Sequence, residues 1–456
     1  MTALPPSGRV PSGRVAARDL LAYAVPAAGA SFHLFFIQFY FLKFATDVLL
    51  AAPGVMGLLF GISRVWDAVS DPLVGYWSDG TRSRLGRRRP WMLAGIPLLA
   101  LFSLMVWSPP AWLTATGLVV WTGVALFGFY TAFTMYTVPH TSLGAELTGD
   151  HHERSRVFGA QRMAFVGGML VAFVAIGWAS EAEDPRRAVV VVALTSALVT
   201  SLVLLPAPAL LSERPEHRGR GAASPYGALR DVMRNPHARL LLSAWFVEGL
   251  GFGVLGVLAP FYAEYVMDRS DLIAVLPAFF VVAGVASIPA WISLSRRIGK
   301  RRVWLVAMVG QAVCFGSTFL LGPDDIAATC ILLAGAGMSN ACGGAIGASM
   351  LADVVDYDEL ASGERKEGAY FAAWGFALKL AIGTIIAGVG FALEGSGFVP
   401  NADQPPAAIL MLRLLFSGTP ALAAVIAFAL MWRFRLDARE HARLRAEIGR
   451  RARPVG

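Results

Sequence analysis

Long apolar segments recur along the 456 residues of this chain and limit what it can fold into. Each segment is near or above the roughly 20 residues that a helix needs to cross a bilayer. The twelve segments lie at about 20–46, 53–78, 91–109, 112–144, 157–179, 187–210, 239–266, 270–295, 303–322, 325–351, 367–394 and 407–434. Only 15% of the residues are charged, against about 25% in a typical soluble domain. We therefore predict an all-α membrane protein with twelve transmembrane helices in a lipid bilayer.

The basic residues predict the orientation of the chain. Arginine and lysine gather at 79–90, 211–238, 296–302 and 433–456, whereas the alternate connections carry few cations. An even number of spans puts both termini on one side, and the positive-inside rule makes that side cytoplasmic. We expect an inner or plasma membrane location. The same basic loops account for the net charge of +8, so no nucleic-acid partner is predicted.

The chain also contains an internal repeat. The motif at 85–91 recurs, offset by 213 residues, at 298–304. Each copy follows the second helix of a predicted six-helix half, which indicates two parallel six-helix repeats. Transporters of this architecture bind their solute and coupling ion between the halves, near the bilayer midplane. The predicted domains are a disordered cytoplasmic tail at 1–19, bundles at 20–210 and 239–434, a cytoplasmic linker at 211–238 and a basic tail at 435–456.

Two aspartates lie in the middle of the second apolar segment. Asp67 and Asp71 are four residues apart, so a helix places both on one face, with Arg64 a turn earlier on the same stripe. A carboxylate at mid-bilayer costs about 2.5–3.5 kcal/mol on insertion scales, and such residues mark ion or substrate pathways. We predict that the pair binds one small cation, Na⁺ or H⁺. In the alternative, Arg64 neutralises one aspartate as a helix-packing ion pair.

Several motifs make the chain resemble the glycoside–pentoside–hexuronide:cation symporters of the major facilitator superfamily. They lie at 40–47, 64–72, 81–91, 352–357 and 368–371, with Asp67-Ala68-Val69-Ser70-Asp71-Pro72 as the most specific part. The resemblance implies a major facilitator fold and a monomer that imports a sugar, glycoside or hexuronide by alternating access. It implies no cofactor beyond the coupling cation. The sequence contains no nucleophile–base constellation, so we predict that the protein is not an enzyme.

The resemblance also implies roles for individual residues. Asp67 and Asp71 would be the carboxylates of the cation site, a Na⁺ site if sodium is the coupling ion. Thr134 would supply a hydroxyl, and Ser70 stands where the family has an asparagine. Oxygen ligands suit a hard cation.

The predicted substrate residues are less uniform. Arg162 and Lys379 are intramembrane charges that could meet a bound anionic or polar group, although Arg162 could instead snorkel to the interface. Lys43 and Arg413, nearer the outer face, are predicted to be anchors. Further candidates are Tyr136 and Glu248, together with Ser31, Thr137 and Thr141, which stand where sugar-binding relatives have carboxylates.

These departures keep two alternatives open. The first is a sodium-coupled transporter of a lysolipid or another amphipathic anion, and the second is a membrane scaffold or sensor that transports nothing.

A cytoplasmic gate is also predicted. Asp79 and Arg88 of the first basic motif could pair with acidic residues of the other half when the inward mouth is shut. The candidate partners are Asp353, Asp356, Asp358 and Glu364. The alternative is that the basic loop only sets the topology.

Overall fold

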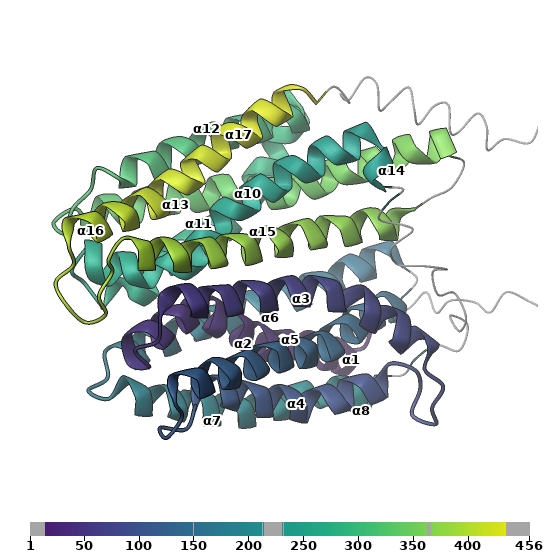
Figure 1. Ribbon diagram of the computed structural model, residues 1–456. Helices are drawn as coiled ribbons and strands as arrows, with labels where there is room; N and C mark the ends of the chain where they lie inside the picture. The colour runs from purple at the N-terminus through teal and green to yellow at the C-terminus, as the bar shows by residue number, and fades with distance from the viewer. Residues whose placement is uncertain are drawn as a thin grey trace, which may run out of the picture. The chain divides into compact units, whose positions relative to one another are not determined.

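The computed structural model of the protein describes residues 14–148, 150–211, 213, 230, 232–362 and 366–434, and every regular element in these ranges is helical. The α-helices are α1 (Ala17–Ala24), α2 (Pro26–Lys43), α3 (Pro53–Gly80), α4 (Arg89–Trp107), α5 (Ala115–Glu146), α6 (His151–Ser180), α7 (Pro185–Leu204), α8 (Pro206–Leu210), α10 (Pro236–Phe261), α11 (Leu272–Ile298), α12 (Lys300–Thr318), α13 (Ile326–Cys342), α14 (Ala348–Ser362), α15 (Glu367–Gly395), α16 (Pro406–Arg413) and α17 (Thr419–Trp432) (Figure 1). Four π-helical segments continue some of them: η1 (Phe44–Val48), η3 (Tyr262–Val266), η4 (Gly343–Gly347) and η5 (Leu414–Gly418). Most of the predicted linker 211–238 and the whole predicted tail 435–456 lie outside the described residues.

Prolines and capping side chains set many of the helix starts. Helices begin on Pro26, Pro53, Pro185, Pro206, Pro236 and Pro406. Proline suits the first helical position because its missing N–H would have no intrahelical partner there. The Thr114 hydroxyl accepts a hydrogen bond from the Gly117 N–H at the start of α5, so this helix starts just inside the predicted segment 112–144.

Ten helices of the described residues are long and apolar enough to cross a membrane. Two further helices, α3 and α12, coincide with the predicted segments 53–78 and 303–322 but are more charged. The prediction of an all-α membrane protein is confirmed, while the count of twelve spans stays a prediction.

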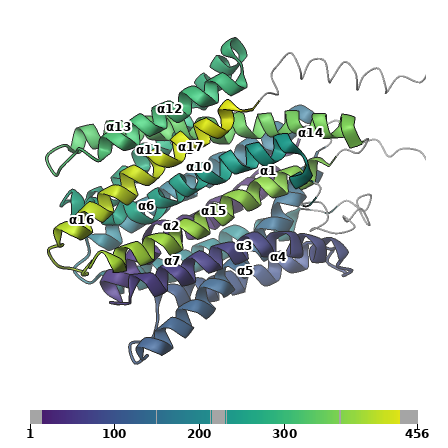
Figure 2. The same ribbon diagram turned by 45° about the horizontal axis from the view of Figure 1, so that its top comes forward.

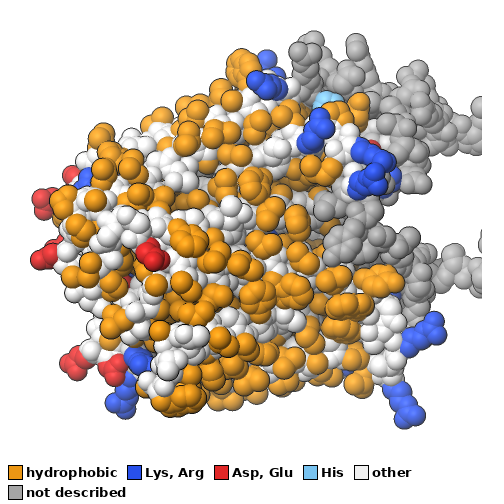
Figure 3. Space-filling view, in the orientation of Figure 1, with side chains coloured by type: hydrophobic (Ala, Val, Ile, Leu, Met, Phe, Trp, Pro, Cys, Tyr) orange, Lys and Arg blue, Asp and Glu red, His pale blue; other side chains and the backbone are white. Residues whose placement is uncertain are grey.

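The outer surface of the helices is apolar. On the face that Figure 3 shows, hydrophobic side chains cover the sides of the helices, and charged side chains gather near the helix ends. Val174, Leu198 and Leu422 are all more than half exposed. Soluble proteins rarely expose contiguous apolar patches above a few hundred Å², so this surface suits a lipid environment.

The helices pack into two compact units. The first comprises the described residues of 1–37, 70–175 and 186–222, and the second those of 38–69, 176–185 and 223–456. In the first, α4 runs beside α5, as Figures 1 and 2 both show. In the second, α10 packs against α15 and α17, and α11 packs against α13. These units do not coincide with the predicted bundles 20–210 and 239–434, whose division stays a prediction.

Two turns of the second unit have the same hydrogen-bond pattern. At the end of η1 the Leu49 N–H donates to the Phe44 carbonyl (3.1 Å) and the Ala51 N–H to Ala45 (2.9 Å). At the end of η3, 218 residues later, Met267 donates to Tyr262 (3.0 Å) and Arg269 to Ala263 (2.9 Å). A residue with positive φ completes each turn, Leu50 (53°) and Asp268 (53°). The likeness of the two turns matches the repeat found in the sequence.

Candidate functional site

Helix α3 carries the predicted carboxylates. With a rise of 1.5 Å per residue, Asp67 and Asp71 lie about 6 Å apart along the helix axis. Asp67 is fully buried, and Asp71 is partly buried. Asp67 belongs to the second compact unit and Asp71 to the first, so their surroundings are described in turn.

Asp67 is bound by two cationic side chains. Its Oδ2 atom accepts a hydrogen bond from Arg64 Nη1 at 3.0 Å and lies 2.9 Å from Nζ of Lys379 on α15. A buried carboxylate needs such partners because its charge has lost its water. The Arg64 contact is the packing pair considered from the sequence, but the Lys379 contact was not predicted. Together with Asp71, these side chains comprise two positive and two negative charges.

Asp71 is surrounded by hydroxyl groups. Thr134 on α5 donates a hydrogen bond from Oγ1 to Asp71 Oδ1 at 3.1 Å. The Ser70 hydroxyl lies 3.2 Å from the same Thr134 oxygen. The structure thus brings three of the predicted cation ligands together within the first unit. A carboxylate and two hydroxyls are hard oxygen donors of the kind that alkali and alkaline-earth cations prefer.

Glycines allow α15 to bring Lys379 to Asp67. A Cβ atom on Gly61 of α3 would lie 2.4 Å from the Gly383 carbonyl oxygen, and one on Gly57 would lie 2.8 Å from Gly390 Cα. Real Cβ contacts are essentially never that short, so the two backbones could not approach as closely with larger residues at these positions. Small residues at helix interfaces have this role in membrane proteins generally.

The predicted substrate residues of the first unit fall into two groups. Ser31 and Tyr136 are fully buried, and their hydroxyls donate to the carbonyls of Ala28 (3.1 Å) and Leu204 (2.8 Å).

The other group is more exposed. Arg162 lies over the ring of Phe165, with 5.0 Å from its guanidinium carbon to the ring centroid. Thr137 donates to the Phe133 carbonyl (2.9 Å), and the Thr141 side chain is exposed. Substrate contacts for all five residues stay predictions.

Glu248 lies inside the packing of the second unit. Both of its carboxyl oxygens accept from Trp304 Nε1, at 3.0 and 3.2 Å. A Cβ on Gly343 would lie 2.6 Å from Glu248 Oε2, so the glycine leaves room for the carboxyl group. Nearby, the rings of Trp245 and Trp374 stack with centroids 4.4 Å apart. A substrate role for Glu248 also stays a prediction.

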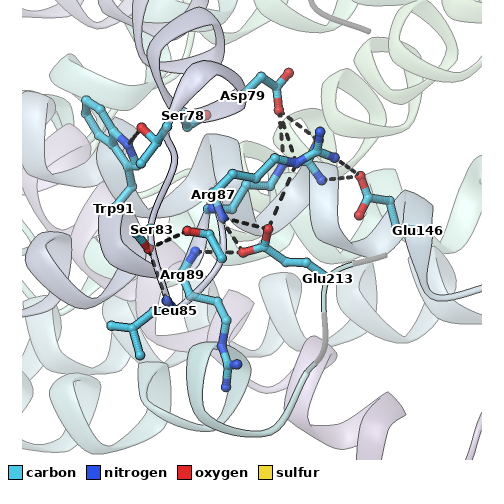
Figure 4. A network of polar contacts seen from close by, with 12 residues as sticks. Ser78, Asp79, Ser83, Leu85, Arg87, Arg89, Trp91, Glu146 and Glu213 are labelled. Carbon is cyan, nitrogen blue, oxygen red and sulfur yellow. Dashed lines mark hydrogen bonds and ion pairs between the residues drawn. The ribbon is translucent and has the colours of Figure 1, made fainter. Parts of the chain in front are cut away.

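The first basic motif forms a dense polar network (Figure 4). Arg88 donates to Asp79 Oδ1 at 3.0 Å and to Glu146 Oε1 at 2.6 Å, and Arg87 also donates to Glu146, at 2.5 Å. The partners in this network all belong to the first unit. Of the predicted gate partners, Asp353 pairs with Lys300 at 2.6 Å, Asp356 is buried, and Glu364 lies outside the described residues. The gate therefore stays a prediction.

Glu213 binds the start of α4. Its carboxylate accepts from the backbone N–H groups of Arg87, Arg88 and Arg89, at 2.9, 2.9 and 3.0 Å. A helix N-terminus favours an anion because its first N–H groups have no intrahelical acceptor. Gly86, with φ of 106°, makes the preceding turn. Sequence reasoning missed Glu213 and Glu146, because a single sequence does not show which distant acid meets a given loop.

Comparison with known proteins covers nearly the whole chain. The profile of the family described as MFS/sugar transport protein matches residues 22–438. The chain is 28% identical over 412 residues to an isoprimeverose transporter of Lactiplantibacillus pentosus, covering 86% of this chain and 83% of the relative. It is 26% identical over 442 residues to a glucuronide carrier protein homolog of Escherichia coli (strain K12), covering 95% of this chain and 96% of the relative.

Among solved structures, the fold is similar to that of a D-xylose–proton symporter. The TM-score is 0.68 at 14% sequence identity, covering 91% of this chain and 97% of the other. This likeness concerns the fold alone. The chain belongs to the MFS/sugar transport protein family, among its glycoside–pentoside–hexuronide:cation symporters, as its motifs predict.

Proposed function

We propose that this symporter couples the import of a sugar, glycoside or hexuronide to Na⁺ or H⁺ through the carboxylates of α3. The observation that carries the proposal is the ion pair between fully buried Asp67 and Lys379, one helical turn from Asp71. Charged groups within a membrane are costly, and they mark ion and substrate pathways. The names of the two relatives, which refer to isoprimeverose and to glucuronide, support a sugar or hexuronide as the solute.

The ammonium of Lys379 occupies a position that suits the coupling cation. A cation that binds to Asp71, Thr134 and Ser70 adds a positive charge beside Asp67 and so weakens its pair with Lys379. Once released, Lys379 can donate to a carboxylate or hydroxyl of the solute, the role that its sequence context predicts. Because binding coupling is reciprocal, the solute tightens cation binding by the same factor.

The proposed architecture has twelve spans in two parallel six-helix repeats, with α3 and α12 as the second span of each known apolar set's half. The matched turns after η1 and η3 support the repeat. Both termini lie in the cytoplasm in this proposal, and the solute crosses unchanged in a monomeric carrier. The gate at Arg88 remains part of it, and Arg88→Glu tests the gate through the accessibility of a cysteine placed in the cytoplasmic mouth.

Uptake by purified protein in liposomes tests this function. Labelled glucuronide, a xylose-containing disaccharide and lysophosphatidylcholine are each offered under an inward sodium gradient and, separately, an inward proton gradient. We expect accumulation of a sugar or glucuronide under one gradient, lost in Asp71→Asn and retained in Asp271→Asn, an exposed loop acid paired with Arg269. Accumulation of the lysolipid alone would select the amphipathic alternative, and no uptake of any of them would favour the scaffold.

A further inference from the structure

The end of α2 takes part in a second buried charge cluster, away from Asp67. Lys43, predicted to be an interfacial anchor, is only 5% exposed. Its Nζ atom lies 2.5 Å from Asp47 Oδ2 on η1 and 2.7 Å from Glu264 Oε2 on η3. It also lies over the rings of Tyr265 and Phe261, 4.9 and 5.6 Å from their centroids. An anchor would extend to water, so Lys43 has a different role.

A third segment joins this cluster. Tyr265 donates its hydroxyl hydrogen to Asp47 Oδ2 at 2.7 Å and accepts from the Asn401 N–H at 3.1 Å. Asn401, in the connection between α15 and α16, also donates from Nδ2 to the Asp47 carbonyl at 2.7 Å. We name Lys43, Asp47, Glu264, Tyr265 and Asn401 the Lys43 cluster. All five lie in the second compact unit.

A neighbouring contact joins the same ends of two more helices. The Gly54 N–H in the first turn of α3 donates to Glu394 Oε2 in the last turn of α15, at 2.9 Å. A Cβ on Gly390 would lie 2.5 Å from the Pro53 carbonyl oxygen. The starts and ends of these helices therefore meet at the end of α3 that is opposite its basic motif. In the proposed topology this is the extracellular end.

The composition of the Lys43 cluster suits a contact that must separate. It contains one ammonium and two carboxylates, which are stable in a buried site only while their hydrogen bonds are intact. When the helix ends part, water can solvate all of these groups, so opening costs less than it would if one buried charge lost its partner. A packed apolar contact would gain nothing comparable from water.

We propose that the Lys43 cluster is an extracellular latch, which closes the outer mouth of the carrier and must open before solute can enter. The proposal rests on the alternating access of the proposed function. The described structure has the latch closed, with the α2–η1 end tied to η3 and to the α15–α16 connection.

Distance measurements between two spin labels test the latch. The labels are attached to Leu50→Cys and Val399→Cys, both exposed and on connections that the latch joins, after the native Cys314, Cys330 and Cys342 have been changed to alanine. The purified full-length protein is reconstituted in lipid without solute. We expect mainly one short distance in this background.

Lys43→Met should raise the ratio of open to closed populations at least about tenfold, the effect of losing one hydrogen bond between charged groups. Tyr265→Phe removes two hydrogen bonds without removing a charge and should raise the same ratio less, which provides a second variant if Lys43→Met does not fold. Lys300→Met is the matched control, because it removes a lysine that pairs with Asp353 instead.

An unchanged distance distribution in the folded variants would overturn the latch. So would an equal opening in Lys300→Met, which would indicate general loosening. The measurement needs no solute, so it stays informative if the uptake test fails. If uptake is intact while the distances never respond, only the latch is lost.

Discussion

Replacing Lys379 with methionine should strengthen the binding of sodium to this protein. In the wild type, Arg64 and Lys379 balance Asp67 and Asp71, so an added cation enters a cluster that is already neutral. Lys379→Met leaves a net charge of −1, which a sodium ion neutralises. Methionine nearly retains the length and apolar stem of lysine, so packing between α3 and α15 should survive.

The magnitude follows from the geometry of the pair. Two unit charges about 4 Å apart interact by about 4 kcal/mol at an effective dielectric constant of about 20. The Lys379 side chain is 22% exposed, so solvent screens part of this energy. A gain of only about 1.4 kcal/mol is a tenfold change in affinity. We therefore expect the sodium concentration at half-maximal stabilisation to fall at least about tenfold.

Thermal unfolding of purified protein over a sodium series measures this effect, because a ligand of the folded state raises the unfolding temperature by mass action. Without sodium, Lys379→Met should unfold at a lower temperature, since fully buried Asp67 has lost one of two partners. The double variant Lys379→Met/Asp71→Asn should not respond to sodium, and Lys300→Met should respond like the wild type. A wild-type sodium response that is unchanged or weaker in Lys379→Met would refute the reasoning.

Three further substitutions test the packing around the site, each by thermal unfolding. Gly383→Val should destabilise the protein by about 1–3 kcal/mol, because a Cβ there would lie 2.6 Å from a carbonyl oxygen of α3, whereas Gly388→Val, with open space around it, should not. Glu213→Ala should cost about 1–2 kcal/mol by removing the acceptor of three N–H groups at the start of α4, and an unchanged unfolding temperature would contradict that role. Leu50→Gly should stabilise the protein by about 1 kcal/mol, since Leu50 is 70% exposed and has a positive φ that glycine adopts without strain; a loss of stability would count against this explanation.

The fold was predictable where the sequence is repetitive. The lengths of the apolar segments and their spacing indicated the helices, and prolines such as Pro53 and Pro236 mark where several begin. The π-helical turn at Phe44–Val48 was not predictable, since its sequence carries no signal that distinguishes it from a continuing α-helix. The compact units were not predictable either, because they depend on contacts between distant segments.

The site was predictable along one helix but not between helices. The spacing of Asp67 and Asp71 is a local property of α3. Lys379 was singled out by its depth in an apolar segment, but its partner depends on the close approach of Gly61 and Gly383, more than 300 residues apart. Lys43 was interpreted as an anchor because its acidic partner Glu264 lies in another segment.

The central claim is that Asp71 couples a cation to the solute. The most direct test compares gradient-driven accumulation with solute exchange in liposomes containing wild type or Asp71→Asn, using the solute that the uptake panel identifies. The account predicts that Asp71→Asn loses accumulation against a concentration gradient yet still exchanges labelled for unlabelled solute across the membrane. Accumulation by Asp71→Asn equal to that of the wild type would contradict the account.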